Sequence, residues 1–134
     1  MARILVCDDD DDMIEFCERL FKMKGHELLV ARNGADAVSA AQSEAPELIL
    51  MDMKMPVAPG GNVSERAGIE ATEQIRLGGA NETVRIIALT GHIMKEFRES
   101  IFAAGCDDML EKPITDFTLL LSAIDRNLEA ERGA

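Results

Sequence analysis

A short apolar run that ends in an acid constrains the fold of this chain more than any other stretch. Leu48-Ile49-Leu50-Met51 leads directly into Asp52, and Pro56 follows shortly after. A continuous apolar run of this length is typical of a strand that is buried on both faces of a parallel sheet. Ligands of open α/β sheets bind just beyond the carboxyl ends of the strands, so Asp52 is the first candidate for a functional residue.

Similar apolar runs recur along the chain, with helix-like segments between them. The strands that we expect are 4–7, 28–31, 48–51, 84–89 and 107–110. Such alternation, without an internal repeat or a linker, predicts one α/β domain over residues 1–134. We expect a doubly wound, five-stranded parallel sheet with helices on both faces.

Apolar residues at helical spacing predict five helices between and after these strands. The first runs from Met13 to a stop at Gly25, after acids at 8–12 of which Asp11 or Asp12 caps it. The second helix is 35–43, and the third is capped by Ser64 and stops at Gly78-Gly79. The fourth is 93–104, with Ile93 and Phe102 on its inner face. The fifth is 117–128, with Phe117 on its inner face.

The segment 57–67 does not fit the alternation. It is rich in Pro, Gly and Asn, which predicts an extended loop. One interpretation is a tolerated surface excursion, because long loops cost little free energy. The other is a lid over the site at Asp52 or an element that selects partners.

Composition excludes several classes of function. The net charge of −11 argues against binding to nucleic acid or to anionic membranes, which need a basic surface. Cys7, Cys17 and Cys106 lack the spacing of a zinc site, and three cysteines do not make a disulfide framework, so we expect buried thiols in a reducing cytoplasm. No apolar run is long enough to span a bilayer. Of the two histidines, we expect His26 to be a plain surface residue.

Polar residues follow the predicted strands at one edge of the sheet. Asp8 and Asp9 follow the first strand, Asp52 the third, Thr90 the fourth and Lys112 the fifth. Parallel strands end at the same edge, so we expect these side chains to converge. Three carboxylates together repel one another unless a cation neutralises them, and their oxygens suit Mg²⁺. With a hydroxyl and an ammonium beside them, they suit phosphoryl transfer onto Asp52.

Five pieces of the chain, in this order, resemble the receiver domain of two-component response regulators. They are Ile4-Leu5-Val6-Cys7-Asp8-Asp9, the stretch 48–56, Ile86-Ile87-Ala88-Leu89-Thr90, Ala104-Gly105-Cys106-Asp107-Asp108, and Lys112-Pro113. The resemblance covers nearly the whole chain and implies a flavodoxin-like (βα)₅ fold with strand order 2-1-3-4-5. It also implies that Asp52 accepts a phosphoryl group from a sensor histidine kinase or a histidine phosphotransfer protein.

The resemblance assigns further roles at the site. Asp9 and Asp52 would bind Mg²⁺ directly, Asp8 would act through water, and Lys54 would offer its backbone carbonyl. Lys54 and His92 would lie next to the phosphoryl group and tune its hydrolysis. The alternative, to which we give equal weight, is that both are exposed polar side chains without a role. Thr90 would change its position when Asp52 is phosphorylated. Met109 occupies the other switch position, where the family often has an aromatic residue.

A protein of this kind signals instead of turning over a substrate. It promotes only its own phosphorylation and dephosphorylation, and without an output domain it would act through contacts with a downstream protein. The resemblance leaves a homodimer open. Compared with the family, Pro56 reaches Gly68 only after an insertion of roughly eight residues.

Two other functions compete with this one. Asp8-x-Asp10, Thr90, Lys112 and Asp107-Asp108 are similar to residues of haloacid-dehalogenase-like Mg²⁺ phosphatases. In that family the acid pair follows the lysine, however, and Asp52 would have no role. The second alternative is an interaction module that works without phosphorylation, for which failure to bind Mg²⁺ would be the signature.

Overall fold

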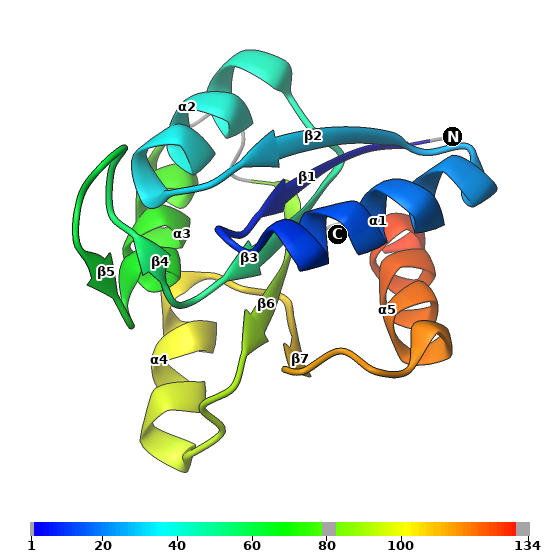
Figure 1. Cartoon of the computed structure of the whole chain (residues 1–134). Coiled ribbons are helices and arrows are strands. Elements are labelled where there is room, and N and C mark those ends of the chain that lie inside the picture. Colours follow the sequence, from blue (N-terminus) through cyan, green and yellow to red (C-terminus); the bar gives the residue numbers. More distant parts are fainter. Residues whose placement is uncertain (1, 79–82, 131–134) are drawn as a thin grey trace.

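A five-stranded parallel sheet forms the centre of the molecule. The computed structural model describes residues 2–78 and 83–130. The strands are β1 (Arg3–Cys7), β2 (Glu27–Ala31), β3 (Leu48–Asp52), β6 (Arg85–Thr90) and β7 (Asp108–Glu111). They lie in the order β2-β1-β3-β6-β7, which confirms the predicted order 2-1-3-4-5 of the parallel strands (Figure 1).

Helices cover both faces of this sheet, as predicted. Helices α1 (Asp11–Lys24) and α5 (Phe117–Glu129) lie on one face. Helices α2 (Gly34–Glu44), α3 (Ala67–Leu77) and α4 (Lys95–Ala104) lie on the other (Figure 1). None of the helices in the ranges 2–78 and 83–130 is long and apolar enough to cross a membrane.

Alternate residues of each strand serve the two faces. In β3, Ile49 and Met51 pack under α2, α3 and α4, while Leu48 and Leu50 pack under α1 and α5. The strand has no solvent-facing side, and this explains why its sequence is continuously apolar. Burial extends to its last residue, because Asp52 is only 4% exposed.

The ends of α1 follow helix-capping rules. Asp10 is the N-cap and accepts a hydrogen bond from the backbone N–H of Asp12, with an Oδ1–N distance of 2.9 Å. The helix therefore begins at Asp11, two residues before the predicted start, and the prediction that Asp11 or Asp12 caps it was wrong. The stop at Gly25 is confirmed, since this residue is left-handed with φ of 76°.

The segment after β3 contains a hairpin that was not predicted. Strands β4 (Met55–Pro56) and β5 (Val63–Ser64) pair antiparallel, so only 57–62 and 65–66 are irregular. The hairpin contacts α2, where the N–H of Ala35 donates to the carbonyl of Val57 at 2.9 Å. Two-residue strands carry no periodicity, and the composition of 57–62 is that of a turn.

Ser64 does not cap α3, contrary to the prediction. Arg66 precedes the helix without a capping side chain, and the Ser64 Oγ instead accepts from the N–H of Arg66 at 3.1 Å. The helix ends at Leu77 with Gly78 as its C-cap. The second predicted stop residue, Gly79, lies outside the described residues.

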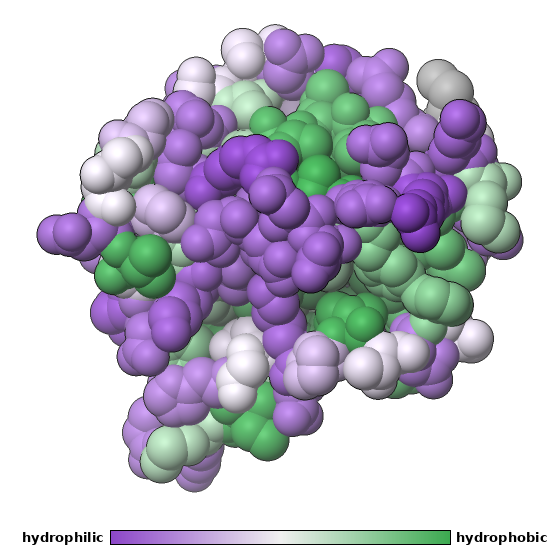
Figure 2. Space-filling view, viewed as in Figure 1, coloured by the Kyte–Doolittle hydropathy of each residue, from purple (hydrophilic) through white to green (hydrophobic). Residues whose placement is uncertain are grey.

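Three aromatic or aliphatic side chains that we expected inside are exposed. Ile93 precedes α4 and is 48% exposed, and Phe102 is 45% exposed because Ile101 beside it takes the inward position. Phe117 opens α5 and stacks on Phe16 at a centroid distance of 4.8 Å instead of entering the core. Figure 2 shows hydrophobic residues reaching the viewed face as patches between hydrophilic ones.

The remaining sequence expectations concern the cysteines and His26. All three cysteines are buried thiols outside any disulfide, as expected. His26 is not a plain surface residue, because it is half-buried and its Nδ1 accepts from the N–H of Ala2 at 3.1 Å. It also packs edge-on against Phe21.

Candidate functional site

Three carboxylates meet at the carboxyl edge of the sheet. Asp8 and Asp9 follow β1 and Asp52 ends β3, and one oxygen from each lies within 4.8 Å of the others. Asp8 is fully buried, whereas Asp9 is exposed. The N–H of Asp10 donates to Asp8 Oδ1 at 3.0 Å and orients that carboxylate. The structure thus brings together the acids that the strand ends predicted.

Lys112 enters the same cluster from the end of β7. Its Nζ lies 3.1 Å from Asp8 Oδ2 and 3.3 Å from Asp52 Oδ2. Its own N–H donates to the carbonyl of Thr90 at 2.8 Å, which fixes the backbone from which the ammonium extends. Burial alone would lower the pKa of Lys112, but the charges of Asp52 and Asp8 raise it above its ordinary value.

The environment of Asp52 disfavours its charged form. Burial is the main cause and the charge of Asp8 the second, and together they raise the pKa of Asp52 to about 7. Lys112 opposes this shift, as does the N–H of Lys54, which donates to Asp52 Oδ1 at 3.2 Å. A cation bound among these carboxylates would therefore reduce the repulsion between the charges of Asp52 and Asp8.

The donor set fits a magnesium ion. It consists of carboxylate oxygens from two adjacent residues and from a neighbouring strand, with one carboxylate open to solvent. Magnesium binds through few carboxylates and keeps waters, so an accessible cluster of this kind suits it. Lys112 supplies one positive charge against three carboxyl groups, which leaves the cluster attractive to a divalent cation.

Thr90 is the last residue of β6 and is buried beside this cluster. Its Oγ1 donates to the carbonyl of His92 at 3.1 Å and accepts from the N–H of His92 at 3.0 Å. The His92 ring in turn stacks on Phe97, with centroids 4.6 Å apart and planes 8° from parallel. Both hydrogen bonds of the Thr90 hydroxyl therefore go to the backbone of its own loop, and a rotation of the Thr90 side chain would break them.

Met109, the residue at the predicted switch position, lies in β7 beside Ala88 of β6. It is half-buried and packs against the core cluster under α2, α3 and α4. The thioether thus occupies space at the edge of the sheet next to α4. Its flexible side chain can adapt to a change in this packing.

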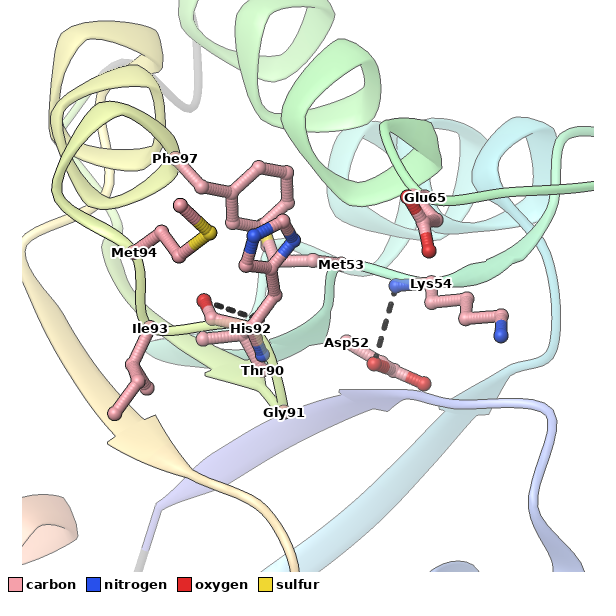
Figure 3. A pocket seen from close by; sticks show the side chains of 10 residues that line it. All are labelled: Asp52, Met53, Lys54, Glu65, Thr90, Gly91, His92, Ile93, Met94 and Phe97. Atoms are coloured by element: carbon pink, nitrogen blue, oxygen red, sulfur yellow. Dashed lines mark hydrogen bonds between the residues drawn. The ribbon is translucent and has the colours of Figure 1, made fainter.

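A pocket of about 470 Å³ opens above Asp52 (Figure 3). The predicted residues Lys54, Thr90 and His92 all line it. Residues that sequence reasoning did not place at the site complete the lining: Met53, Glu65, Gly91, Ile93, Met94 and Phe97. Glu65 belongs to the irregular segment before α3, where no periodic pattern marks a position as facing the site.

Gly68 allows α3 to approach the end of β3. A Cβ at this position would lie 2.3 Å from the carbonyl oxygen of Asp52 and 2.7 Å from the Cα of Met53. Its N–H donates to the carbonyl of Met53 at 3.0 Å. The absence of a side chain at Gly68 is therefore part of how the backbone around Asp52 is placed.

The acid pair that suggested a phosphatase lies elsewhere. The carboxylate of Asp107 contacts Arg76 at 3.0 Å. The backbone N–H of Asp107 donates to the carbonyl of Ile86 near the start of β6, whereas the site lies at the end of that strand. Asp108 accepts from the side chain of Asn127 at 3.0 Å. The geometry therefore does not bring these acids to the carboxylate cluster.

Known proteins are similar in sequence to this chain over most of its length. The family model described as "Response regulator receiver domain" matches residues 4–125. Protein PilH of Pseudomonas aeruginosa is 32% identical over 120 residues, which cover 90% of this chain and 93% of PilH. The response regulator DivK of Brucella anthropi is 29% identical over 84% of this chain and 85% of DivK. Sensor protein GacS of Pseudomonas syringae is 35% identical, but the chain spans only 12% of its length.

Solved structures agree with these relatives. The receiver domain of the sensor histidine kinase PA1611 from Pseudomonas aeruginosa, with magnesium in its active-site cleft, superimposes with a TM-score of 0.81 and 28% identity, covering 96% of this chain and 98% of that domain. The chemotaxis protein CheY4 of Vibrio cholerae gives a TM-score of 0.82 and 25% identity, covering 95% of this chain and 98% of CheY4. From the matched family model and the full-length similarity to PilH, this chain belongs to the family of response regulator receiver domains.

Proposed function

We propose that Asp52 is the phosphoacceptor of this receiver domain. The observation that carries the proposal is the buried carboxylate of Asp52, which ends β3 within 3.3 Å of the Lys112 ammonium and in one cluster with Asp8 and Asp9. The donor would be a phosphohistidine of a sensor histidine kinase or of a histidine phosphotransfer protein. Mg²⁺ would neutralise charge on the phosphoryl group.

Transfer requires only one bond to form and one to break. A carboxylate oxygen of Asp52 attacks phosphorus, the bond from phosphorus to the donor imidazole nitrogen breaks, and its electron pair stays on that nitrogen. Lys112 is already placed to balance the added charge on the phosphoryl oxygens. Asp9, Asp52 and the backbone carbonyl of Lys54 would hold Mg²⁺ directly, with Asp8 acting through water.

The output would be a change in protein contacts. A phosphoryl group on Asp52 offers Thr90 a new acceptor in place of the His92 backbone, and movement of Thr90 shifts the adjacent face of α4, β7 and α5, where Met109 packs. The domain would promote only its own phosphorylation and dephosphorylation, with Lys54 and His92 among the pocket residues that tune the rate of hydrolysis. The three buried cysteines, none of them in a disulfide, support the proposed cytoplasmic location.

The test is to incubate the protein with Mg²⁺ and a small phosphodonor and to measure its intact mass. Wild type should gain one phosphate, and Asp52→Asn should gain none. Asp12→Asn, which removes an exposed acid in the first turn of α1, is the matched control and should behave as wild type. A phosphate gain that survives Asp52→Asn would contradict the assignment.

A further inference from the structure

We propose that Glu65, which the insertion after β4 brings to the site, binds the water that hydrolyses the phosphoryl group on Asp52. The inference rests on the proposed function and names a further residue for the same site. Hydrolysis ends the phosphorylated state, so Glu65 would set the lifetime of the signal.

Glu65 lines the same pocket as Asp52, Lys54, Thr90 and His92. Figure 3 shows its carboxylate directed into the pocket on the Lys54 side, above Asp52. The other pocket residues come from the ends of β3 and β6, from the loop 91–94 and from α4, whereas Glu65 comes from the junction between β5 and α3. The inserted segment therefore places the carboxylate of Glu65 at the pocket.

The backbone around Glu65 is held on both sides although its side chain is exposed. On one side, β5 pairs with β4 and the Oγ of Ser64 accepts from the N–H of Arg66 at 3.1 Å. On the other side, the N–H of Gly68 donates to the carbonyl of Met53 at 3.0 Å. These contacts fix the entry to α3 relative to the end of β3. Glu65 is thus carried on an ordered junction, not on a free loop.

The chemistry of the pocket leaves a role for an acceptor. Water must be oriented toward phosphorus by a group that accepts a hydrogen bond from it. The side chain of Lys54 has only donors. The ring of His92 is stacked on Phe97 on the α4 side of the pocket, across from Glu65 (Figure 3). Asp52 would carry the phosphoryl group itself, and Thr90 would donate to it. The carboxylate of Glu65 accepts and faces the open side of the pocket.

The reaction in which Glu65 would act consumes one water. The water oxygen forms a bond to phosphorus, the bond between phosphorus and the Asp52 oxygen breaks, and the electron pair returns to the Asp52 carboxylate. One proton of the water remains on the inorganic phosphate that leaves. The other is released to solvent, past the carboxylate that held it.

The lifetime of the phosphorylated protein tests this role. Wild type, Glu65→Ala and Glu65→Gln are phosphorylated with a small donor, freed of donor by gel filtration, and followed by intact mass. Glu65→Ala should lengthen the half-life about tenfold, a modest effect for an exposed group. Glu65→Gln keeps a carbonyl acceptor and should fall between Glu65→Ala and wild type. Glu73→Gln, an exposed acid of α3 that does not line this pocket, should leave the half-life unchanged.

A half-life of Glu65→Ala equal to or shorter than that of wild type would overturn the proposal for Glu65 and leave Asp52 as acceptor. No phosphate gain on wild type would instead overturn the proposed function and this inference together. Mg²⁺ affinity gives a second readout, measured by calorimetry because the chain has no Trp or Tyr. It should be the same in Glu65→Ala and wild type, and a tenfold loss would make Glu65 a metal ligand instead.

Discussion

The ammonium of Lys112 lies 3.3 Å from the carboxylate of Asp52, although β6 separates their strands in the sheet. The lysine reaches past the end of β6 and contacts Asp8 on the far side as well, at 3.1 Å. One cation thus joins the ends of β7, β3 and β1. The proposed acceptor site is already assembled in the unphosphorylated protein, and its negative charges exceed the single positive charge of Lys112.

Removing the carboxylate of Asp52 should stabilise the protein in the absence of metal. The pKa of this group is about 7 in the folded chain, against an ordinary value of 3.8. The folded state therefore favours the protonated acid, and its contribution to the free energy of unfolding is lost progressively as pH rises from about 4 to about 7. At pH 8 with chelator, Asp52→Asn should raise the free energy of unfolding by about 2–4 kcal/mol. Urea unfolding followed by circular dichroism at pH 5 and pH 8 measures this; an equal difference at both pH values would contradict it.

Magnesium affinity should follow the same titration. In the proposed site, Mg²⁺ would bind the ionised carboxylate of Asp52 and compete with the proton, so affinity should rise with pH until Asp52 is ionised. With a pKa of about 7, binding at pH 6 should be about tenfold weaker than at pH 8. Calorimetric titration at the two pH values is the measurement. Equal affinities would mean that Asp52 is not a ligand or that its pKa lies well below 6.

A side chain at residue 68 should disturb both stability and the site. In Gly68→Ala, the new Cβ would meet the carbonyl oxygen of Asp52 at 2.3 Å, which forces α3 away from β3. We expect a loss of about 1–3 kcal/mol in the free energy of unfolding. Gly91→Ala is the control for stability, because a Cβ there has nothing within 4 Å. Equal unfolding midpoints for the two variants would refute the close packing of α3 on β3.

Thr90→Ala should separate phosphorylation from its consequence. Alanine has no hydroxyl that could leave the His92 backbone and donate to the phosphoryl oxygens, so the face of α4, β7 and α5 should keep its unphosphorylated state. Amide shifts in ¹H–¹⁵N spectra, with and without phosphodonor, report this. Thr90→Ala should still gain phosphate but lose most of the shifts on that face, and Thr90→Ser should retain them. Full wild-type shifts in Thr90→Ala would exclude Thr90 as the switch.

The strand ends were predictable because parallel strands terminate at one edge. An apolar run followed by an acid, a threonine or a lysine is enough to place Asp8, Asp52, Thr90 and Lys112 together. Sequence periodicity could not place Glu65, because β4 and β5 are two residues each and their pairing depends on contacts with α2 and α3.

The burial of some side chains depends on tertiary packing and could not be predicted from periodicity. Phe102 is one position from Ile101, and only the contact of α4 with the sheet determines which of the two is buried. The burial of Arg76 is a similar case. It lies in α3 beside the carbonyls of Val84 and Gly105 and the carboxylate of Asp107, partners that no local pattern connects to it.

The proposed function depends on Asp52 being the residue that carries the phosphoryl group. Borohydride reduces an acyl phosphate of aspartate to homoserine, so reduction followed by peptide sequencing in a mass spectrometer locates the modified residue. After incubation with Mg²⁺ and a small phosphodonor, homoserine should appear at position 52 in wild type and in Asp12→Asn, and at no position in Asp52→Asn. Homoserine at position 8 or 9, or its persistence in Asp52→Asn, would contradict the assignment of Asp52 as the phosphoacceptor.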